Sequence, residues 1–171
     1  NLLNKQGNAT YNGVFNGSPT INATNPQCNF TADSCNIIVP TADTIINSYT
    51  PVLALDICKN KITVEDASEF NVGDTVLMIQ MKGAAIDSTN TAAFGNITNY
   101  RSAGNYEFNY IKSITGNIIE LKNTVSRSYE IPAGKVQLIR APYFQNFTAN
   151  TTVTCLPWDG SKGGVVVINA A

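Results

Sequence analysis

Short apolar runs alternate with polar residues along most of this chain, and glycine, asparagine and lysine separate the runs. A period of two is typical of half-buried β-strands, and no long window carries the period of a helix. Gly116-Asn117 forms the clearest hairpin turn, because apolar strands flank it on both sides. The chain is therefore predicted to be all-β, with strands at residues 52–57, 61–64, 75–81, 105–114, 118–121, 136–140 and 165–169.

The segment from Phe70 to Val76 predicts a bent architecture. Gly73 can adopt the positive φ of a tight turn, and Asp74 can accept hydrogen bonds from the free amides of that turn. An apolar strand follows immediately. Together with the Gly-Asn hairpin, this pattern indicates a small, bent β-barrel-like domain at residues 51–142.

Residues 1–50 differ from the rest of the chain in composition. Only Lys5, Asp33 and Asp43 are charged there, and asparagine, threonine, glycine, proline and serine dominate. Turn-forming residues at this density predict an irregular N-terminal arm that must lie on another surface to be ordered.

Residues 143–171 are interpreted as a junction and the first strand of a following Gly-rich β region. Val165–Ile168 is apolar throughout, so a strand at this position needs neighbours on both sides. Because this strand stops without a turn or a cap, we expect it to lead into a further β module of a longer protein.

A long insertion, Lys82–Gly104, separates two predicted strands and is rich in alanine, threonine, asparagine and glycine. Loops of this length in compact domains are usually functional or mobile. Its large apolar side chains Phe94 and Tyr100 are the candidate binding surface, since recognition usually resides in loops on a rigid scaffold. The alternative is a passive hairpin packed on the N-terminal arm.

The composition argues against several classes of function. Charged residues make up 13% of the chain, the net charge is −1, and histidine is absent. Nucleic-acid binding needs a basic face, and the commonest general base and imidazole metal ligands are missing. We therefore expect no catalytic residue, no metal and no cofactor. No apolar run is long enough for a membrane helix, and a signal peptide is expected to be absent or already removed.

Four cysteines, an even number without metal-ligand spacing, favour two disulfides in an oxidising compartment over zinc. Three pairings are possible. The preferred pairing joins Cys28 to Cys35 and Cys58 to Cys155, because the second bond would close a long loop across the central domain. Buried free thiols are the alternative.

Two clusters of side chains have competing interpretations. Glu65, Asp66 and Glu69 could hold calcium, but they lack the Asp-x-Asp repetition of calcium loops, so a solvated turn is favoured. The alternating aromatics at 106, 108 and 110 could form a platform for sugar rings, but ordinary core packing is favoured for a half-buried strand. Trp158 is interpreted as a packing anchor at the junction to the next module.

From about Thr50 onwards, the chain resembles an N-terminal region of large surface proteins that Bacteroidota export through the type IX secretion system, many of them gliding-associated or adhesin-like. The matching strings are residues 70–83, 103–108, 113–117, 136–143 and 157–165. The resemblance implies a secreted, non-catalytic protein at the cell surface that continues into a Gly-rich β region, repeats and a C-terminal sorting domain. It supplies no catalytic motif.

The resemblance also implies O-glycosylation at Asp-Ser/Thr-apolar triplets. Such triplets occur at Asp43-Thr44-Ile45, Asp74-Thr75-Val76 and Asp87-Ser88-Thr89. Thr75 falls in a predicted barrel strand, so Thr44 and Ser88 are the better candidates.

The function predicted from these observations is a non-catalytic structural or adhesive module of a large extracellular surface protein, near the N-terminal end of an extended fibre. Its expected partners are neighbouring modules of the same chain and a surface glycan or another surface protein. The alternatives are a carbohydrate-binding domain that uses the aromatic stripe, and an accessory domain of a β-helical polysaccharide-degrading enzyme. The full-length gene would separate these alternatives.

Overall fold

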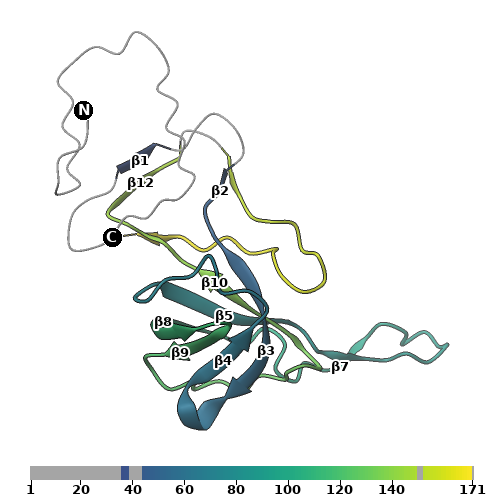
Figure 1. The fold of residues 1–171 in the computed structure, drawn as a ribbon. Coiled ribbons are helices and arrows are strands. Elements are labelled where there is room, and N and C mark those ends of the chain that lie inside the picture. The colour runs from purple at the N-terminus through teal and green to yellow at the C-terminus, as the bar shows by residue number, and fades with distance from the viewer. Residues whose placement is uncertain (1–35, 39–43, 150–151, 171) are drawn as a thin grey trace, which may run out of the picture.

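The computed structural model describes residues 36–38, 44–149 and 152–170 (Figure 1). In this part of the chain every regular element is a β-strand, apart from the short 3₁₀ turn η1 (Ile57–Lys59), so the predicted all-β class is confirmed. The strands are β1 (Asn36–Ile38), β2 (Thr44–Ile45), β3 (Tyr49–Asp56), β4 (Lys61–Val64), β5 (Thr75–Lys82), β6 (Ala85–Ile86), β7 (Ile97–Asn99), β8 (Tyr106–Thr115), β9 (Ile118–Leu121), β10 (Lys135–Arg140), β11 (Tyr143–Phe144), β12 (Asn146–Thr148), β13 (Val153–Thr154) and β14 (Asn169–Ala170).

Six of these strands close into the predicted barrel, in the order β10-β3-β4-β9-β8-β5. Every neighbouring pair is antiparallel. The barrel is filled by aliphatic side chains that alternate inward along the strands, which is why a period of two was visible in the sequence. Its interior cluster is Val52, Ile62, Val64, Ala67, Phe70, Val76, Met78, Ile111, Ile119, Leu121, Val125, Val136 and Leu138.

The tight turns form where the sequence placed them. Gly73 has a φ of 92°, and the Asp74 carboxylate accepts a hydrogen bond of 2.7 Å from the backbone N–H of Asn71. The same carboxylate forms an ion pair of 2.8 Å with Arg140, which ties this turn to the end of β10. Gly116, with a φ of 56°, lies in the hairpin turn between β8 and β9.

Short strands that precede or follow the barrel pair in parallel, either across the barrel or, for β11 and β14, within the part of the chain that follows it. β1 pairs with β12, β2 with β13, and β11 with β14. The barrel strands themselves run from Tyr49 to Arg140. The proposed division at residues 50 and 142 remains a prediction.

The predicted strand at 165–169 is wrong. Residues 155–169, here called the C-terminal strap, form no ladder until Asn169–Ala170 pairs with β11. The strap (yellow in Figure 1) lies beside β10, and its residue Val167 packs with Tyr49, Leu77, Ile139 and Ala141 in the outer cluster. Side chains hold this strap, because Asn47, Tyr49 and Gln137 form hydrogen bonds with its backbone groups.

Candidate binding surface

Three aromatic side chains on β8 form an exposed row on the outside of the barrel. Tyr106, Phe108 and Tyr110 are exposed by 56%, 55% and 47%. The favoured interpretation, that they are ordinary core, is therefore wrong. Their alternation is real, but the inward positions of β8 are taken by Asn109 and Ile111, both buried.

The sequence held a signal for this orientation. Lys112 shares the parity of the aromatic row, whereas Ile111 has the opposite parity. A lysine continues an exposed face far more readily than a core. The polar side chain of Asn109 can be buried because its amide is hydrogen-bonded to the backbone of Asn123. Its Oδ1 accepts from the Asn123 N–H at 2.9 Å, and its Nδ2 donates to the Asn123 carbonyl at 2.9 Å.

The row lies between an apolar strand and a cation. On one side the register places Ile79 opposite Tyr106 and Leu77 opposite Phe108. On the other side, the Lys122 ammonium lies 5.8 Å from the centroid of the Tyr110 ring, within the range of a cation–π interaction. Lys122 is in none of the ion pairs between described residues.

The charged residues next to the row have partners of their own. Lys112 forms an ion pair of 2.6 Å with Glu120, and the hydrogen bonds from Lys112 and Ser113 lower the pKa of the Glu120 carboxyl. Glu107 accepts hydrogen bonds from the N–H and the hydroxyl of Ser126, at 2.9 and 3.0 Å. The Lys112 and Glu120 charges offset each other, while Lys122 leaves a positive charge at the Tyr110 end of the row.

The insertion forms a hairpin, β6–β7, that extends away from the barrel (Figure 1). Phe94 and Tyr100 are exposed by 66% and 67%, and no residue between 85 and 103 is buried. The hairpin is closed at its base by hydrogen bonds of Gln80 with Gly104 and Asn105, both 2.9 Å. The aromatic row begins immediately after this base, because Tyr106 is the first residue of β8.

The hairpin turn is stabilised by its own polar residues. The Asp87 carboxylate accepts from the Thr89 hydroxyl at 2.6 Å and from the Thr89 N–H at 2.8 Å. These two bonds lower the pKa of Asp87. The hairpin thus has local order without burial of a core.

The structure overturns the preferred disulfide between Cys58 and Cys155, because both are free thiols. Cys58 lies in η1 after the end of β3, whereas Cys155 packs on the outer cluster that contains Tyr49, at the start of β3. Seven residue steps along a strand span about 23 Å. A disulfide needs Cα atoms within about 7 Å. Cys28 and Cys35 lie outside the described residues.

The candidate O-glycosylation sites differ in accessibility. Ser88 is exposed in the hairpin, while Thr44 is half-buried in β2, as is Thr75 in β5. Their modification remains a prediction, with Ser88 now the more accessible of the two proposed sites.

The acidic residues Glu65, Asp66 and Glu69 lie in and beside a turn. The Asp66 carboxylate accepts from the Ser68 N–H at 2.9 Å, and hydrogen bonds from Ser68 lower its pKa. In the described part of the chain, no three His, Cys, Asp or Glu side chains gather as metal ligands. The described residues also contain no helix long and apolar enough to cross a membrane.

No family model and no curated protein matches this chain. Among solved structures, the chain is similar to the Gp54 tailspike of Acinetobacter baumannii bacteriophage AP22, whose structure was solved in complex with A. baumannii capsular saccharide. The identity is 24% and the TM-score is 0.40, over 63% of this chain and 17% of the tailspike chain. A similarity of this size carries no functional argument for the present chain.

Proposed function

We propose that this chain is a non-catalytic adhesive module of a secreted cell-surface protein, and that it binds through the aromatic row of β8 together with the adjoining hairpin. The observation that carries the proposal is the row itself: three large rings, each about half exposed, in line on a closed barrel. Exposed apolar patches on stable domains usually mark interaction sites. A ladder that is paired on both sides of β8 holds the rings in position before binding.

The hairpin adds reach to this surface. Its exposed apolar side chains include Ile86, Phe94, Ile97 and Tyr100. Exposing them in water is unfavourable in the isolated chain, and contact with a partner would remove that apolar area from water. The hairpin and the row together would therefore contact a broad surface rather than a small molecule.

The first candidate partner is the surface of another protein. A carbohydrate is the second candidate partner, and the spacing of the aromatic rings in the row favours it. Alternate residues of a strand lie about 7 Å apart. Their rings can stack on successive sugars of an extended glycan through the C–H groups of the sugar faces, because an aromatic face carries partial negative charge. Lys122, at the Tyr110 end of the row, would suit a glycan with carboxylate groups.

The proposal is tested by adhesion of the full chain, immobilised on beads, to protein-coated and polysaccharide-coated surfaces. The row variant carries Tyr106→Ser, Phe108→Ser and Tyr110→Ser; the hairpin variant carries Phe94→Ser and Tyr100→Ser. The matched control is Tyr143→Ser, because Tyr143 is exposed by 43% and lies outside the row. The row variant should lose most adhesion, the hairpin variant part of it, and the control none.

A glycan array then distinguishes the two candidate partners. If the chain binds arrayed glycans and the row variant does not, the carbohydrate candidate is supported. Adhesion to protein-coated surfaces alone supports a protein surface as the partner. Full adhesion by the row variant would contradict the proposal. So would turnover of a polysaccharide by the wild-type chain.

A further inference from the structure

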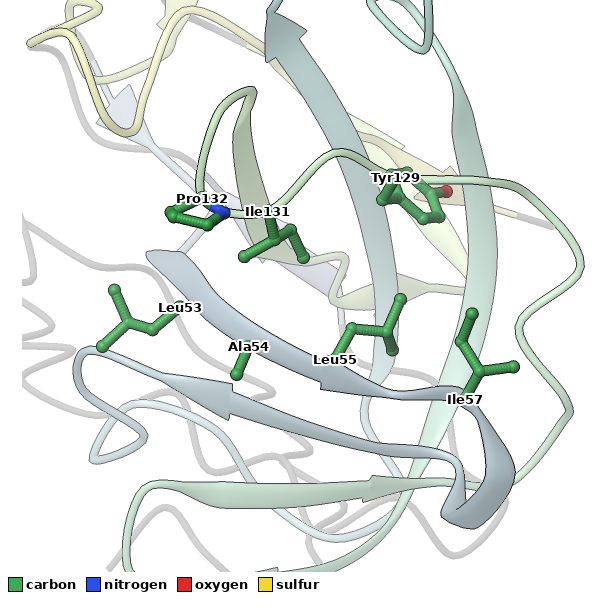
Figure 2. Close-up of a pocket in the computed structure, with 7 residues that line it drawn as sticks. All are labelled: Leu53, Ala54, Leu55, Ile57, Tyr129, Ile131 and Pro132. Atoms are coloured by element: carbon green, nitrogen blue, oxygen red, sulfur yellow. The ribbon is translucent and has the colours of Figure 1, made fainter.

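An apolar groove opens on the barrel wall beside β3 (Figure 2). Its volume is about 380 Å³, and its lining residues are uncharged and, apart from Tyr129, have apolar side chains: Leu53, Ala54, Leu55, Ile57, Tyr129, Ile131 and Pro132. Leu53 and Ile57 are each 51% exposed. None of these residues belongs to β8, the strand that carries the aromatic row.

One wall of the groove is a strand with an open edge. β3 runs from Tyr49 to Asp56, but β10 pairs with it only over Tyr49–Pro51. Beyond Pro51, no described strand pairs with β3 on the β10 side, while β4 continues to pair with its other side. A bulge between Val52 and Ala54 accompanies this separation. Backbone donors and acceptors at such an edge are available to another strand.

The opposite wall is fixed in position. The buried side chain of Gln80 accepts a hydrogen bond of 2.8 Å from the N–H of Glu130, and its Nε2 donates to the Lys82 carbonyl at 3.0 Å. Gly134 closes the same loop with a bond of 2.6 Å from its N–H to the Glu130 carbonyl. A Cβ at Gly134 would collide with Gln80, so this loop packs closely on the barrel. The groove is therefore formed before anything binds.

We propose that this groove is a strand-addition site for an extended peptide with uncharged, apolar side chains at alternate positions. The open edge of β3 would pair with the peptide backbone, and one face of the peptide would bury its side chains on the lining. The span from Leu53 to Ile57 is about 13 Å, which matches four peptide residues. Because no lining residue is charged, a charged side chain on the buried face would be desolvated without a partner.

The combination of an edge and a groove selects this occupant. A small apolar molecule would use the lining but not the backbone groups of β3. A strand uses both. The experiment below separates the two by changing the backbone of the probe and leaving its side chains unchanged.

The probe is a capped heptapeptide of alternating valine and threonine, titrated into the full chain. Its matched control is the same peptide with N-methyl groups on the residues whose N–H would face β3. We expect saturable binding of the first peptide and at least tenfold weaker binding of the second. Amide hydrogen exchange at residues 53–56 should slow at least tenfold when the first peptide is bound.

Two variants locate the binding site. Leu53→Asp should weaken binding at least tenfold, because it places a charge in the lining. Ile118→Asp is the control, since Ile118 is 44% exposed on β9, outside the groove; it should bind as wild type does. Circular dichroism checks that both variants are folded, and the N-methyl comparison needs no variant at all.

Three results would each overturn the proposal. The first is equal binding of the N-methylated peptide, which would indicate a site for small apolar groups. The second is unchanged binding by folded Leu53→Asp. The third is the absence of saturable binding of the unmodified peptide at millimolar concentration.

Discussion

The two hydrophobic clusters of this protein are enclosed in different ways. The interior cluster lies inside the barrel, where continuous strand ladders surround it. The outer cluster lies between the barrel wall and the C-terminal strap. Two buried amide side chains attach that strap: Asn47 bonds both the N–H and the carbonyl of Val167, and Gln137 bonds both backbone groups of Gly163.

This difference bears on how each region opens. The interior cluster can be exposed only by breaking the barrel, so its burial contributes to global stability. The strap is held by a few side-chain bonds and can separate as a local unit. The chain has a single tryptophan, Trp158, and it lies in the strap. Its fluorescence therefore reports on the strap, while circular dichroism reports on the barrel.

The largest effect is expected inside the barrel. Leu138 is fully buried in the interior cluster. Leu138→Ala should lower the free energy of unfolding by about 2–5 kcal/mol, because it removes buried methyl groups and leaves a cavity. Urea denaturation should show tryptophan fluorescence and circular dichroism changing together. A circular dichroism transition at the same urea concentration as in the wild type would show that the interior cluster does not determine the stability of the barrel.

The next largest effect is expected at the strap. Asn47→Ala leaves buried backbone groups of Val167 without partners, which costs about 1–3 kcal/mol for each group left unsatisfied. We expect the Trp158 transition to move to lower urea concentration while the circular dichroism transition moves little. Asn169→Ala is the matched control, because the hydrogen bond from its side chain to the Thr75 hydroxyl is 3.5 Å long. A single shared transition in Asn47→Ala would show that strap and barrel form one cooperative unit.

A smaller effect is expected from pH. The Tyr49 hydroxyl donates a bond of 2.7 Å to the Val165 carbonyl. Burial, followed by the charge of Cys155, raises the pKa of Tyr49 to about 12, against the opposing hydrogen bond from Leu156. An unfolded tyrosine has a pKa of about 10. The raised value stabilises the folded strap fully below pH 10, and that stabilisation is lost as the pH rises towards about 12.

The measurement is Trp158 fluorescence across an alkaline titration. Tyr49→Phe should remove the tyrosine-dependent step and weaken strap attachment by about 0.5–1.5 kcal/mol at neutral pH, the usual value of one hydrogen bond. Cys155→Ala is the control, because it removes the neighbouring thiol but leaves the Tyr49 hydroxyl in place, and it should keep the step. An unchanged titration in Tyr49→Phe would assign the step to another group.

The smallest effect on stability is expected at the hairpin. Replacing residues 85–103 by a short glycine–serine linker removes no buried side chain. The free energy of unfolding should change by less than about 0.5 kcal/mol, as for most surface changes. Adhesion should fall under the proposed function. A large loss of stability would show that the hairpin is part of the scaffold.

Local patterns in the sequence were sufficient to predict the six barrel strands and the turns at Gly73 and Gly116. Gly73 and Asp74 act within three residues of each other, so their roles are visible in a short window. The strap was not predictable in this way, since Asn47 bonds a residue 120 positions away and Gln137 one 26 positions away. The aromatic row was found by its alternation, but its outward face required the parity of Lys112. The groove depends on where β10 stops pairing with β3, which no local pattern encodes.

The parallel pairings outside the barrel determine how the molecule would carry tension. β1 and β2 precede the barrel, and their partners β12 and β13 follow it. When the chain is stretched along its length, the force acts on β1 and β2 at their N-terminal ends. It acts on β12 and β13 at their C-terminal ends. Parallel partners are then loaded in shear, so their hydrogen bonds share the force instead of opening one after another. The force would then pass from β1 to β12 and from β2 to β13. The barrel, which lies between these strands in the sequence, would be shielded from it.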